Sequence, residues 1–404
     1  MNRPASPDKH CVLTINGGSS SIKIALYEVN STLTCLLSGE VENIGQKSAM
    51  FRFKRSAHDP QQQIDIKGYD YASAANWLID WLEKQVDFAA VKGIGHRVVQ
   101  GLEHEKPEKI NDALMEDLKK ISAYDPDHLP EEIKMIAIFR QRFPEIPQLA
   151  CFDTSFHTTM PPVAKLLAIP RRFYAMGIKR YGFHGISYAY LMEQLDLEEW
   201  DETARGRVVL AHLGNGASLA AVKDGKSIDT SMGFTPAAGI PMGTRTGDLD
   251  PGVAWYLMKT GKLSPKQFNG LINHESGLLG ISGRSADMRE LVKHQDTDPH
   301  AAEAVEFFCY QTKKWIGAFA AALHGMDTLV FSGGIGENSA EVRERVCDGL
   351  EFLGIELDKA RNLNNEAIIS SDISTISVRV IKTDEELMIA KSVCHLLHYR
   401  IKNG

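Results

Sequence analysis

Each half of the chain begins with the same pattern, two strand-like runs separated by a turn of small residues. Residues 11–15 and 22–29 flank the first turn, and residues 207–213 and 219–225 flank the second. Both turns contain an asparagine, and short apolar runs around such turns are typical of β-hairpins. The hairpins lie nearly half of the 404 residues apart. The pattern predicts two similar domains around one cleft, with a coincidental pair of hairpins as the alternative.

Between and after the hairpins, the apolar residues follow a helical period. We expect amphipathic helices over residues 71–86 and 131–143, and a long apolar helix over 301–325. A buried strand over 327–332 precedes a further helix over 339–350. Strands that alternate with helices predict an α/β fold.

The composition excludes several classes of protein. Charged residues make up 24% of the chain and hydrophobic residues 43%, which is normal for a globular protein and not for a disordered or disulfide-stapled one. The net charge of −7 gives no overall attraction to nucleic acid or to an anionic membrane. The apolar run at 11–15 is too short for a signal peptide or a membrane span. Because the six cysteines are scattered without zinc-site spacing, we expect a cytoplasmic protein with reduced thiols.

Three glycine-rich turns follow strand-like runs, at residues 16–21, 214–218 and 333–336. A backbone that approaches a polyphosphate closely cannot carry bulky side chains, and the third turn also leads into a helix N-terminus. None of the turns has the GxxxxGK[ST] or GxGxxG pattern. Together they favour nucleotide binding over purely structural turns.

Polar residues gather in other loops that a core would exclude. Arg97 lies between apolar neighbours, Asp153 follows a strand-like run, His184 precedes a helix, and Arg245 lies among turn residues. Guanidinium groups bind carboxylate and phosphoryl oxygens bidentately. Two arginines and a histidine in such loops therefore indicate a site for an anion.

The motifs that contain these residues resemble those of the acetate kinase family in order and spacing. They are NGGSSSIK, GHRVV, FDTSFH, YGFHG, HLGNGAS, MGTRTGDLDPG, GLLGISG, GGIGEN and TDEELMIA, between residues 16 and 390. The resemblance implies an α/β chain with the duplicated actin-like (ribonuclease H-like) ATPase fold, two lobes around a nucleotide cleft. We expect the first lobe at 1–153, the nucleotide-binding second lobe at 154–383, and a C-terminal helix at 384–404 that packs back on the first lobe.

The resemblance also implies an activity, acetate kinase: reversible transfer of the γ-phosphoryl group of ATP to acetate, giving acetyl phosphate and ADP. It implies Mg²⁺, with Mn²⁺ as an alternative, and a homodimer without nucleic-acid or membrane partners. By motif position it implies Asn16 and Glu385 as magnesium-site residues, Arg97 and Arg245 as active-site arginines, His184 as the transition-state histidine and Asp153 as the catalytic aspartate. The implied acyl-binding residues are Val99, Phe183 and Pro236, with Arg97. The implied residues on the phosphate and nucleotide side are Ser19, Ser21, Lys23, His212, Leu213, Gly214, Asn215, Gly216, Asp287, Met288, Arg289, Gly334, Ile335, Gly336, Glu337 and Asn338.

Elementary chemistry agrees with these roles. Acetate is ionised at pH 7 and needs no general base, only relief from the negative charge of the phosphates. Arginines, a histidine and Mg²⁺ can supply that relief, because phosphoryl transfer depends on positioning and electrostatics. Asp153 is then better interpreted as a residue that orients an arginine or the metal shell than as a base.

Three alternatives remain open. Propionate or butyrate kinase is the nearest neighbour, since one methylene changes binding by only about 1 to 3 kcal/mol. A sugar or polyol kinase of the same fold would use Asp153 as the base for a hydroxyl. A filament or chaperone module would keep the nucleotide turns without Arg97, His184 and Arg245.

Two positions depart from the family pattern. Asp127 in DPDHLP stands where the family usually has an apolar residue of the acyl pocket, in APLHNP, while His128 matches. An ionised Asp127 would repel a substrate carboxylate, so we expect it to point away or to pair with a cation, unless the pocket takes a more polar acid. Tyr188 stands where the family commonly has histidine.

Overall fold

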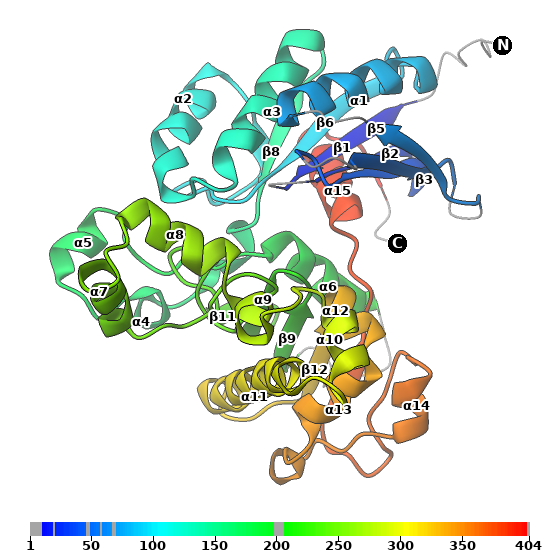
Figure 1. The fold of residues 1–404 in the computed structure, drawn as a ribbon. Coiled ribbons are helices and arrows are strands. Elements are labelled where there is room, and N and C mark those ends of the chain that lie inside the picture. Colours follow the sequence, from blue (N-terminus) through cyan, green and yellow to red (C-terminus); the bar gives the residue numbers. More distant parts are fainter. Residues whose placement is uncertain are drawn as a thin grey trace. The chain divides into compact units, whose positions relative to one another are not determined.

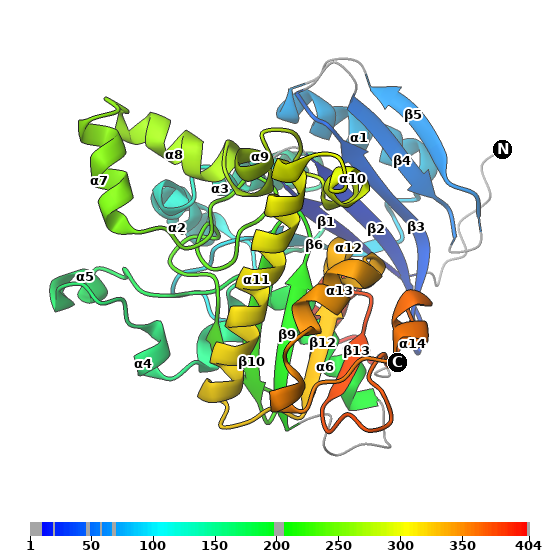
Figure 2. The same ribbon diagram turned by 60° about the horizontal axis from the view of Figure 1, so that its bottom comes forward.

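The computed structural model describes residues 10–18, 21–45, 49–56, 59–66, 70–197 and 206–401. Ser19, which was expected on the phosphate side, lies outside the described residues. The chain divides into two compact units, one up to Ser155 together with the residues from Asp384 onward, the other Phe156–Thr383. Figures 1 and 2 label the elements of both units. Over the described ranges, no helix is both long and apolar enough to pass through a bilayer.

The first unit contains a mixed sheet whose described strands follow the order β5-β4-β3-β2-β1-β6-β8-β7. β1 pairs antiparallel with β2 and parallel with β6, and β6 pairs parallel with β8. The strands are β1 (Cys11–Gly17), β2 (Ile22–Val29), β3 (Leu33–Glu42), β4 (Ala49–Lys54), β5 (Gln62–Ile66), β6 (Val91–Val98), β7 (Glu108–Lys109) and β8 (Gln148–Phe152).

The second unit contains a sheet whose described strands follow the order β11-β10-β9-β12-β13. β9 pairs antiparallel with β10 and parallel with β12, and β12 pairs parallel with β13. The strands are β9 (Arg207–Leu213), β10 (Ala217–Lys223), β11 (Lys226–Thr230), β12 (Thr328–Ser332) and β13 (Ser377–Val380).

The two sheets share one topology. The run β3-β2-β1-β6-β8 of the first sheet and the run β11-β10-β9-β12-β13 of the second have the same order. Three antiparallel strands in each run are followed by two parallel ones. The repeated hairpins of the sequence are therefore the first two strands of each run, and the predicted α/β fold with a duplicated core is confirmed.

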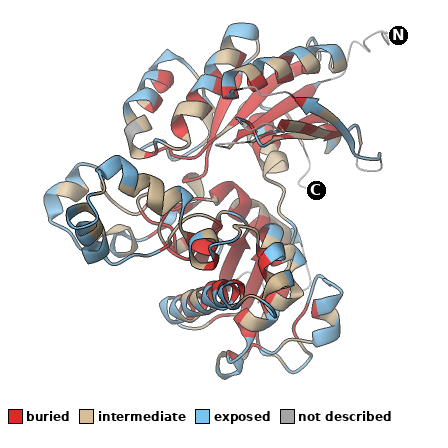
Figure 3. Cartoon of the chain, in the orientation of Figure 1, coloured by how far each residue is buried: buried red, intermediate tan, exposed pale blue. Residues whose placement is uncertain are grey.

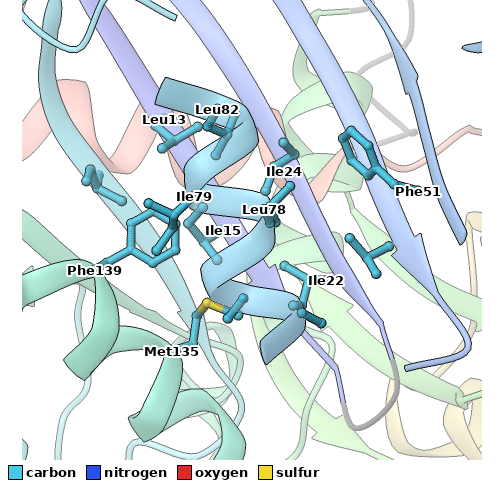
Figure 4. Packing of buried hydrophobic residues seen from close by; sticks show 14 of the residues in the cluster. Leu13, Ile15, Ile22, Ile24, Phe51, Leu78, Ile79, Leu82, Met135 and Phe139 are labelled. Atoms are coloured by element: carbon cyan, nitrogen blue, oxygen red, sulfur yellow. The ribbon is translucent and has the colours of Figure 1, made fainter. Parts of the chain in front are cut away.

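The core of the first unit lies where helices cover the central strands. Asp70 accepts a hydrogen bond from the N–H of Ser73 at 2.8 Å and so caps α1. Leu78, Ile79 and Leu82 of α1 pack over the apolar side chains of β1 and β2 (Figure 4). Figure 3 shows the buried residues concentrated on the central strands of each sheet. The helices of this unit are α1 (Tyr71–Gln85), α2 (Asp112–Ile121), α3 (Leu129–Arg142) and α15 (Glu385–Leu396).

Helix α15 comes from the end of the chain and packs on β1 and β6. Ala390, Val393 and Cys394 share a cluster of buried residues with the N-terminal strands. A Cβ at Gly95 in β6 would lie 2.4 Å from Cγ2 of Ile389, so glycine allows the helix to approach the sheet closely.

The helices of the second unit include the predicted ones. The helices expected over 301–325 and 339–350 are confirmed as α11 and α13. The helices expected over 71–86 and 131–143 are confirmed as α1 and α3 of the first unit. The α-helices among the described residues of this unit are α4 (Pro162–Lys165), α5 (Arg171–Ala175), α6 (Gly185–Leu197), α7 (Pro251–Lys259), α8 (Pro265–His274), α9 (Gly277–Ser282), α10 (Met288–His294), α11 (Pro299–Ala322), α12 (Gly333–Asn338), α13 (Ala340–Cys347) and α14 (Lys359–Leu363).

The third glycine-rich turn differs from the prediction, because its residues are already helical. Gly333 has a φ of +74° and makes the bend directly after β12, so α12 begins at once. Its N–H is not bare, since it donates to Oε1 of Glu337 at 3.0 Å.

Candidate active site

Arg97 and Asp153 form a buried ion pair at the ends of two neighbouring parallel strands of the first unit. Arg97 lies near the end of β6, and Asp153 follows β8, where its N–H donates to the carbonyl of Val98 at 3.0 Å. Nε of Arg97 donates to both carboxylate oxygens at 3.1 Å, and Nη2 donates to Oδ2. The side chains are 14% and 1% exposed, respectively. Because one guanidinium engages both oxygens, Asp153 fixes the orientation of Arg97.

The opposite charges of Arg97 and Asp153 stabilise the charged form of each side chain. Burial disfavours the charged guanidinium, but the negative charges of Asp153 and Glu385 outweigh that effect and raise the pKa of Arg97. Burial raises the pKa of Asp153, and the positive charge of Arg97 opposes that rise. Arg97 therefore keeps its positive charge at this edge of the sheet.

Asn16 connects Arg97 to two carboxylates from the other end of the chain. Its Nδ2 donates to Oε2 of Glu385 at 3.0 Å and to Oε1 of Glu386 at 3.2 Å. Its Oδ1 accepts from Nη1 of Arg97 at 3.4 Å. Lys23 lies opposite Asn16 in the hairpin, and burial raises the pKa of Glu386 against the opposing charge of Lys23. These residues form one polar cluster in the first unit.

The oxygen atoms of this cluster fit Mg²⁺. This ion prefers carboxylate oxygens and is usually held by one or two of them, with water and phosphate oxygens at its other positions. Glu385 and Glu386 offer such carboxylates, whereas the Asn16 amide turns its nitrogen toward them and its oxygen toward Arg97. Asn16 therefore orients the carboxylates in this arrangement. In the part of the chain that the structure describes, no group of three His, Cys, Asp or Glu side chains is arranged to hold a metal.

Val99, expected in the acyl pocket, is anchored by a carboxyl group that the sequence motifs did not indicate. Its N–H donates to Oε2 of Glu132 at 2.9 Å, and both residues are buried. Burial raises the pKa of Glu132 to about 8. Oε1 of Glu132 and the hydroxyl of Tyr71 are buried without a hydrogen-bond partner in the described residues. Glu132 is therefore largely protonated at neutral pH.

The segment that departs from the family pattern starts α3. Nδ1 of His128 lies 2.9 Å from Oδ1 of Asp125, which is itself buried. Asp127 is partly buried.

In the second unit, His184 is held in an uncommon backbone conformation. Its φ of +58° lies in the left-handed region, immediately before α6. Nδ1 lies 2.9 Å from Oγ of Ser218 in β10, and the ring stacks on that of His212 with centroids 4.4 Å apart. Nδ1 of His212 is in turn 2.8 Å from Oγ of Ser187. The two histidine rings thus have defined orientations.

Gly216 brings His184 and Arg245 to the same place. A Cβ at Gly216 would lie 3.4 Å from Nε2 of His184 and 3.7 Å from Nη1 of Arg245. Nη1 of Arg245 also donates to the carbonyl of Pro236 at 3.3 Å. His184 and Arg245, which the sequence predicted for one site, therefore both lie beside the backbone of the glycine-rich turn after β9, and Pro236 of the same predicted site contacts Arg245.

Phe183, the second predicted acyl-pocket residue, is buried and held through its backbone. Its carbonyl accepts from Nε2 of His157 at 3.0 Å, so Nδ1 of that ring accepts from the hydroxyl of Ser227 at 2.8 Å. Burial lowers the pKa of His157 to about 4, which keeps the ring neutral. His157 is a structural residue of the FDTSFH motif.

A pocket of about 980 Å³ lies in the second unit, where two glycine-rich segments meet the start of α10. Asp287 caps α10 and pairs with Arg289, whose Nη2 is 2.6 Å from Oδ2 of Asp287. The predicted nucleotide residues that line the pocket are Gly214, Asn215, Asp287, Met288, Arg289, Gly334, Ile335 and Asn338.

The other predicted nucleotide residues take different positions. Glu337 turns inward, where its Oε1 also accepts from the N–H of Thr383 at 3.1 Å. The carbonyl of Gly336 accepts from the buried guanidinium of Arg343 at 2.8 Å. Leu213 is a core residue of β9, while His212 and Gly216 adjoin His184. These residues shape the segments around the pocket and are not among its lining.

The repeated strand order and the glycine-lined pocket are consistent with the actin-like ATPase fold. The chain belongs to the Acetokinase family, which it matches over residues 11–391. An acetate kinase of Methylocella silvestris is 42% identical, with 96% of this chain and 98% of that protein covered. A propionate kinase of Citrobacter rodentium is 40% identical, with 96% and 97% covered.

A solved structure agrees with these relatives. The crystal structure of a propionate kinase from Francisella tularensis has a TM-score of 0.88 at 38% identity, with 96% of this chain and 99% of that chain covered. The family, the fold class and the enzyme class that the sequence predicted, a phosphotransferase with a carboxyl group as acceptor, are confirmed. The names of the relatives match both the predicted acetate kinase activity and its propionate alternative.

The sequence analysis missed three polar residues around the predicted ones. Glu386 follows Glu385 directly and shares its contact with Asn16. Ser218 lies inside the HLGNGAS motif. Glu132 could have been found from the helical period of α3, because it lies on the buried stripe that also contains Leu129 and Ile133.

Proposed function

We propose that the chain transfers the γ-phosphoryl group of ATP to acetate, reversibly and with Mg²⁺, to give acetyl phosphate and ADP. The observation that carries this proposal is the engagement of both Asp153 oxygens by Arg97. A hydroxyl nucleophile needs a base, whereas both carboxylate oxygens of Asp153 are engaged in holding Arg97. A carboxylate nucleophile needs none, so this geometry favours a short acid over a sugar or polyol.

The proposed roles follow from the two groups of contacts. Arg97, positioned by Asp153, and Arg245 neutralise the reacting anions, and His184 donates a hydrogen bond to the phosphoryl group in transfer. The nucleotide occupies the glycine-lined pocket beside Asp287. Val99, Phe183 and Pro236 are the proposed residues around the acyl methyl group, with Lys23 on the phosphate side.

For Mg²⁺, the proposed holders are Glu385 with Glu386, oriented by Asn16. When bound, the ion would supply positive charge that offsets the negative charge of the ATP phosphates. Removal of divalent ions with EDTA should abolish turnover, and Mg²⁺ or Mn²⁺ should restore it. Glu385→Gln should raise the Mg²⁺ concentration that is needed for half-maximal rate, and an unchanged requirement would contradict the assignment.

The test of the reaction is the trapping of the product with hydroxylamine. Only phosphorylation of a carboxylate gives a mixed anhydride that forms a hydroxamate. With MgATP and acetate, hydroxamate should appear in step with ADP, and glucose or glycerol in place of acetate should give neither. ADP release with a sugar and no hydroxamate would contradict the proposal.

A propionate kinase is the second candidate, because propionate kinases are among the relatives at about 40% identity. Asp127 distinguishes this chain from the family pattern next to the expected acyl pocket. We propose that its carboxylate does not face the substrate, so Asp127→Leu should change the ratio of kcat/KM for acetate and propionate by less than about threefold. A larger shift, or a preference of the unchanged chain for a hydroxylated acid, would contradict this.

We also propose a cytoplasmic homodimer that forms through the second unit. Helices α4, α5, α7 and α8 have no buried residue in the single chain, and Trp255 and Tyr256 of α7 are 65% and 62% exposed. No disulfide joins the six cysteines, all of which lie within the described residues. Trp255→Glu should shift the mass in analytical ultracentrifugation from dimer to monomer. The control Phe352→Glu, at a position outside these helices that is more exposed than Trp255, should remain a dimer.

A further inference from the structure

Tyr188, one of the two departures from the family pattern, is connected to His184 through one serine. The side chain of Tyr188 in α6 is fully buried, and its hydroxyl lies 2.5 Å from Oγ of Ser218. Ser218 is also fully buried, and the same Oγ lies 2.9 Å from Nδ1 of His184. The three side chains form a chain of hydrogen bonds that ends on a proposed catalytic residue.

The direction of the hydrogens in this chain follows from the partners available to Tyr188. Its phenol hydrogen is buried and needs an acceptor, because a buried donor left without one is costly. Among the described residues, Ser218 provides the acceptor for the phenol hydrogen. Burial raises the pKa of Tyr188, so the phenol keeps this hydrogen throughout the neutral range.

The direction continues through Ser218. A hydroxyl has one hydrogen, and Oγ of Ser218 already accepts from Tyr188, so its own hydrogen is free to donate to Nδ1 of His184. A neutral imidazole whose Nδ1 accepts carries its hydrogen on Nε2. Nε2 is the atom that lies beside Gly216, as Nη1 of Arg245 also does.

We propose that Tyr188, acting through Ser218, is a positioning residue that keeps His184 neutral with its hydrogen on Nε2, and so directs that hydrogen toward the transferred phosphoryl group. The second half of this statement rests on the proposed function. The first half concerns the free protein alone.

This chain of hydrogen bonds from Tyr188 through Ser218 to His184, called the relay below, also opposes protonation of His184. An imidazolium carries a hydrogen on Nδ1, so Ser218 would have to turn its own hydrogen away, and either that hydrogen or the phenol hydrogen of Tyr188 would lose its buried acceptor. Two other described groups adjoin the ring. Arg245 brings a positive charge near Nε2, and His212, which stacks on the ring, is hydrogen-bonded to Ser187. A neutral donor beside a fixed cation avoids two like charges at one place.

The test is the tautomer of His184, measured by ¹⁵N NMR on the full-length protein with ring-labelled histidine. The signal is assigned by its loss in His184→Gln. We expect the unchanged chain to show the Nε2–H form. Tyr188→Phe should give a mixture of the two tautomers and a higher pKa of His184, because Ser218 then no longer receives a hydrogen and can accept one from Nδ1.

Kinetics separate this role from a structural one. In Tyr188→Phe, kcat should fall about tenfold at pH 6 and less at pH 8, with the KM for ATP unchanged, because misdirection of one hydrogen bond acts on the transition state. Ser218→Ala should have the same effect. Ser218→Thr keeps the hydroxyl, so it should retain the Nε2–H tautomer and the rate of the unchanged chain. Tyr181→Phe removes another buried phenol of the second unit, which donates to the carbonyl of Gly177, and should change neither.

The outcomes are distinct. A hydrogen on Nδ1 in the unchanged chain, or a tautomer that is the same in Tyr188→Phe, overturns the relay. If Tyr188→Phe does not fold, the two Ser218 variants decide by the same spectrum. If no acyl phosphate forms but the spectra behave as expected, the relay stands and the proposed function fails.

Discussion

Replacement of Asp153 by asparagine tests whether this carboxylate acts as a base or as the holder of Arg97. Asparagine has the same shape but replaces one of the two acceptor oxygens with an NH₂ group, which faces the guanidinium donors. The pair is buried, with side chains 14% and 1% exposed, so solvent cannot compensate for the lost contact. Loss of one partner from a buried ion pair costs about 3 to 5 kcal/mol. Because one acceptor remains, we expect the lower end of that range.

The effect on the rate follows from the same contact. One misdirected charge-assisted hydrogen bond is worth about 1.5 to 3 kcal/mol, which corresponds to a loss of roughly 10- to 150-fold in kcat. Urea unfolding followed by circular dichroism measures the first quantity, and hydroxamate formation at saturating MgATP measures the second. Asp327→Asn is the matched control. Asp327 binds Arg207 in the same two-pronged way, but that pair is 36% and 23% exposed, so we expect a loss of stability below about 1 kcal/mol and an unchanged kcat.

A double-mutant cycle distinguishes the two roles of Asp153. If Asp153 acts through Arg97, then Asp153→Asn should lower kcat by less than about twofold once Arg97 has been replaced by alanine. If the two losses multiply, Asp153 contributes independently of Arg97. The interpretation of the aspartate as a positioning residue would then be wrong, and a sugar or polyol kinase would regain its candidate base.

Three further predictions use contacts described above. Burial raises the pKa of Glu132 from 4.5 to about 8, so between these pH values the folded state binds more protons than the unfolded state and loses stability as the pH rises. Glu132→Gln can still accept the hydrogen bond from the N–H of Val99 but does not titrate. This variant should therefore flatten the pH dependence of the free energy of unfolding by up to about 1.4 kcal/mol per pH unit in that range. Gly243→Ala places a Cβ 2.0 Å from Oδ1 of Asn215 and should raise the KM for ATP about tenfold while the KM for acetate stays constant, and equal changes in both would contradict the pocket assignment. Gly95→Ala should destabilise the fold by about 1 to 3 kcal/mol in urea unfolding, because its Cβ would overlap the apolar face of α15.

The sequence was sufficient for the architecture because the relevant signals are local. Small-residue turns between apolar runs specify hairpins, and the apolar stripe of residues 71–85 specifies a helix that covers them. The duplication predicted two similar domains, and the order of the strands in each sheet came from the structure. The third glycine-rich segment was predicted less well, because Glu337 satisfies the N–H of Gly333 from within α12 and a turn becomes helix.

The site could be predicted only in part, because its geometry depends on contacts between residues far apart in sequence. Asn16 and Glu385 are separated by 369 positions, and no local pattern shows that the amide nitrogen faces the carboxylates. The relay from Tyr188 through Ser218 likewise joins a helix and a strand that are 30 positions apart. Residue types and motif order identify such groups, but hydrogen-bond directions require coordinates.

The closure of the first unit by α15 has a consequence for synthesis of the protein on the ribosome. β1 and β6 are made early, but the helix that covers Gly93 and Gly95 is translated only after the whole second unit. Until then, the nascent N-terminal strands carry an uncovered apolar face, which is a target for chaperones. A chain that stops before residue 385 would also lack both glutamates beside Asn16. Premature termination would thus leave an exposed apolar face on the first unit and remove the two carboxylates that we propose for Mg²⁺.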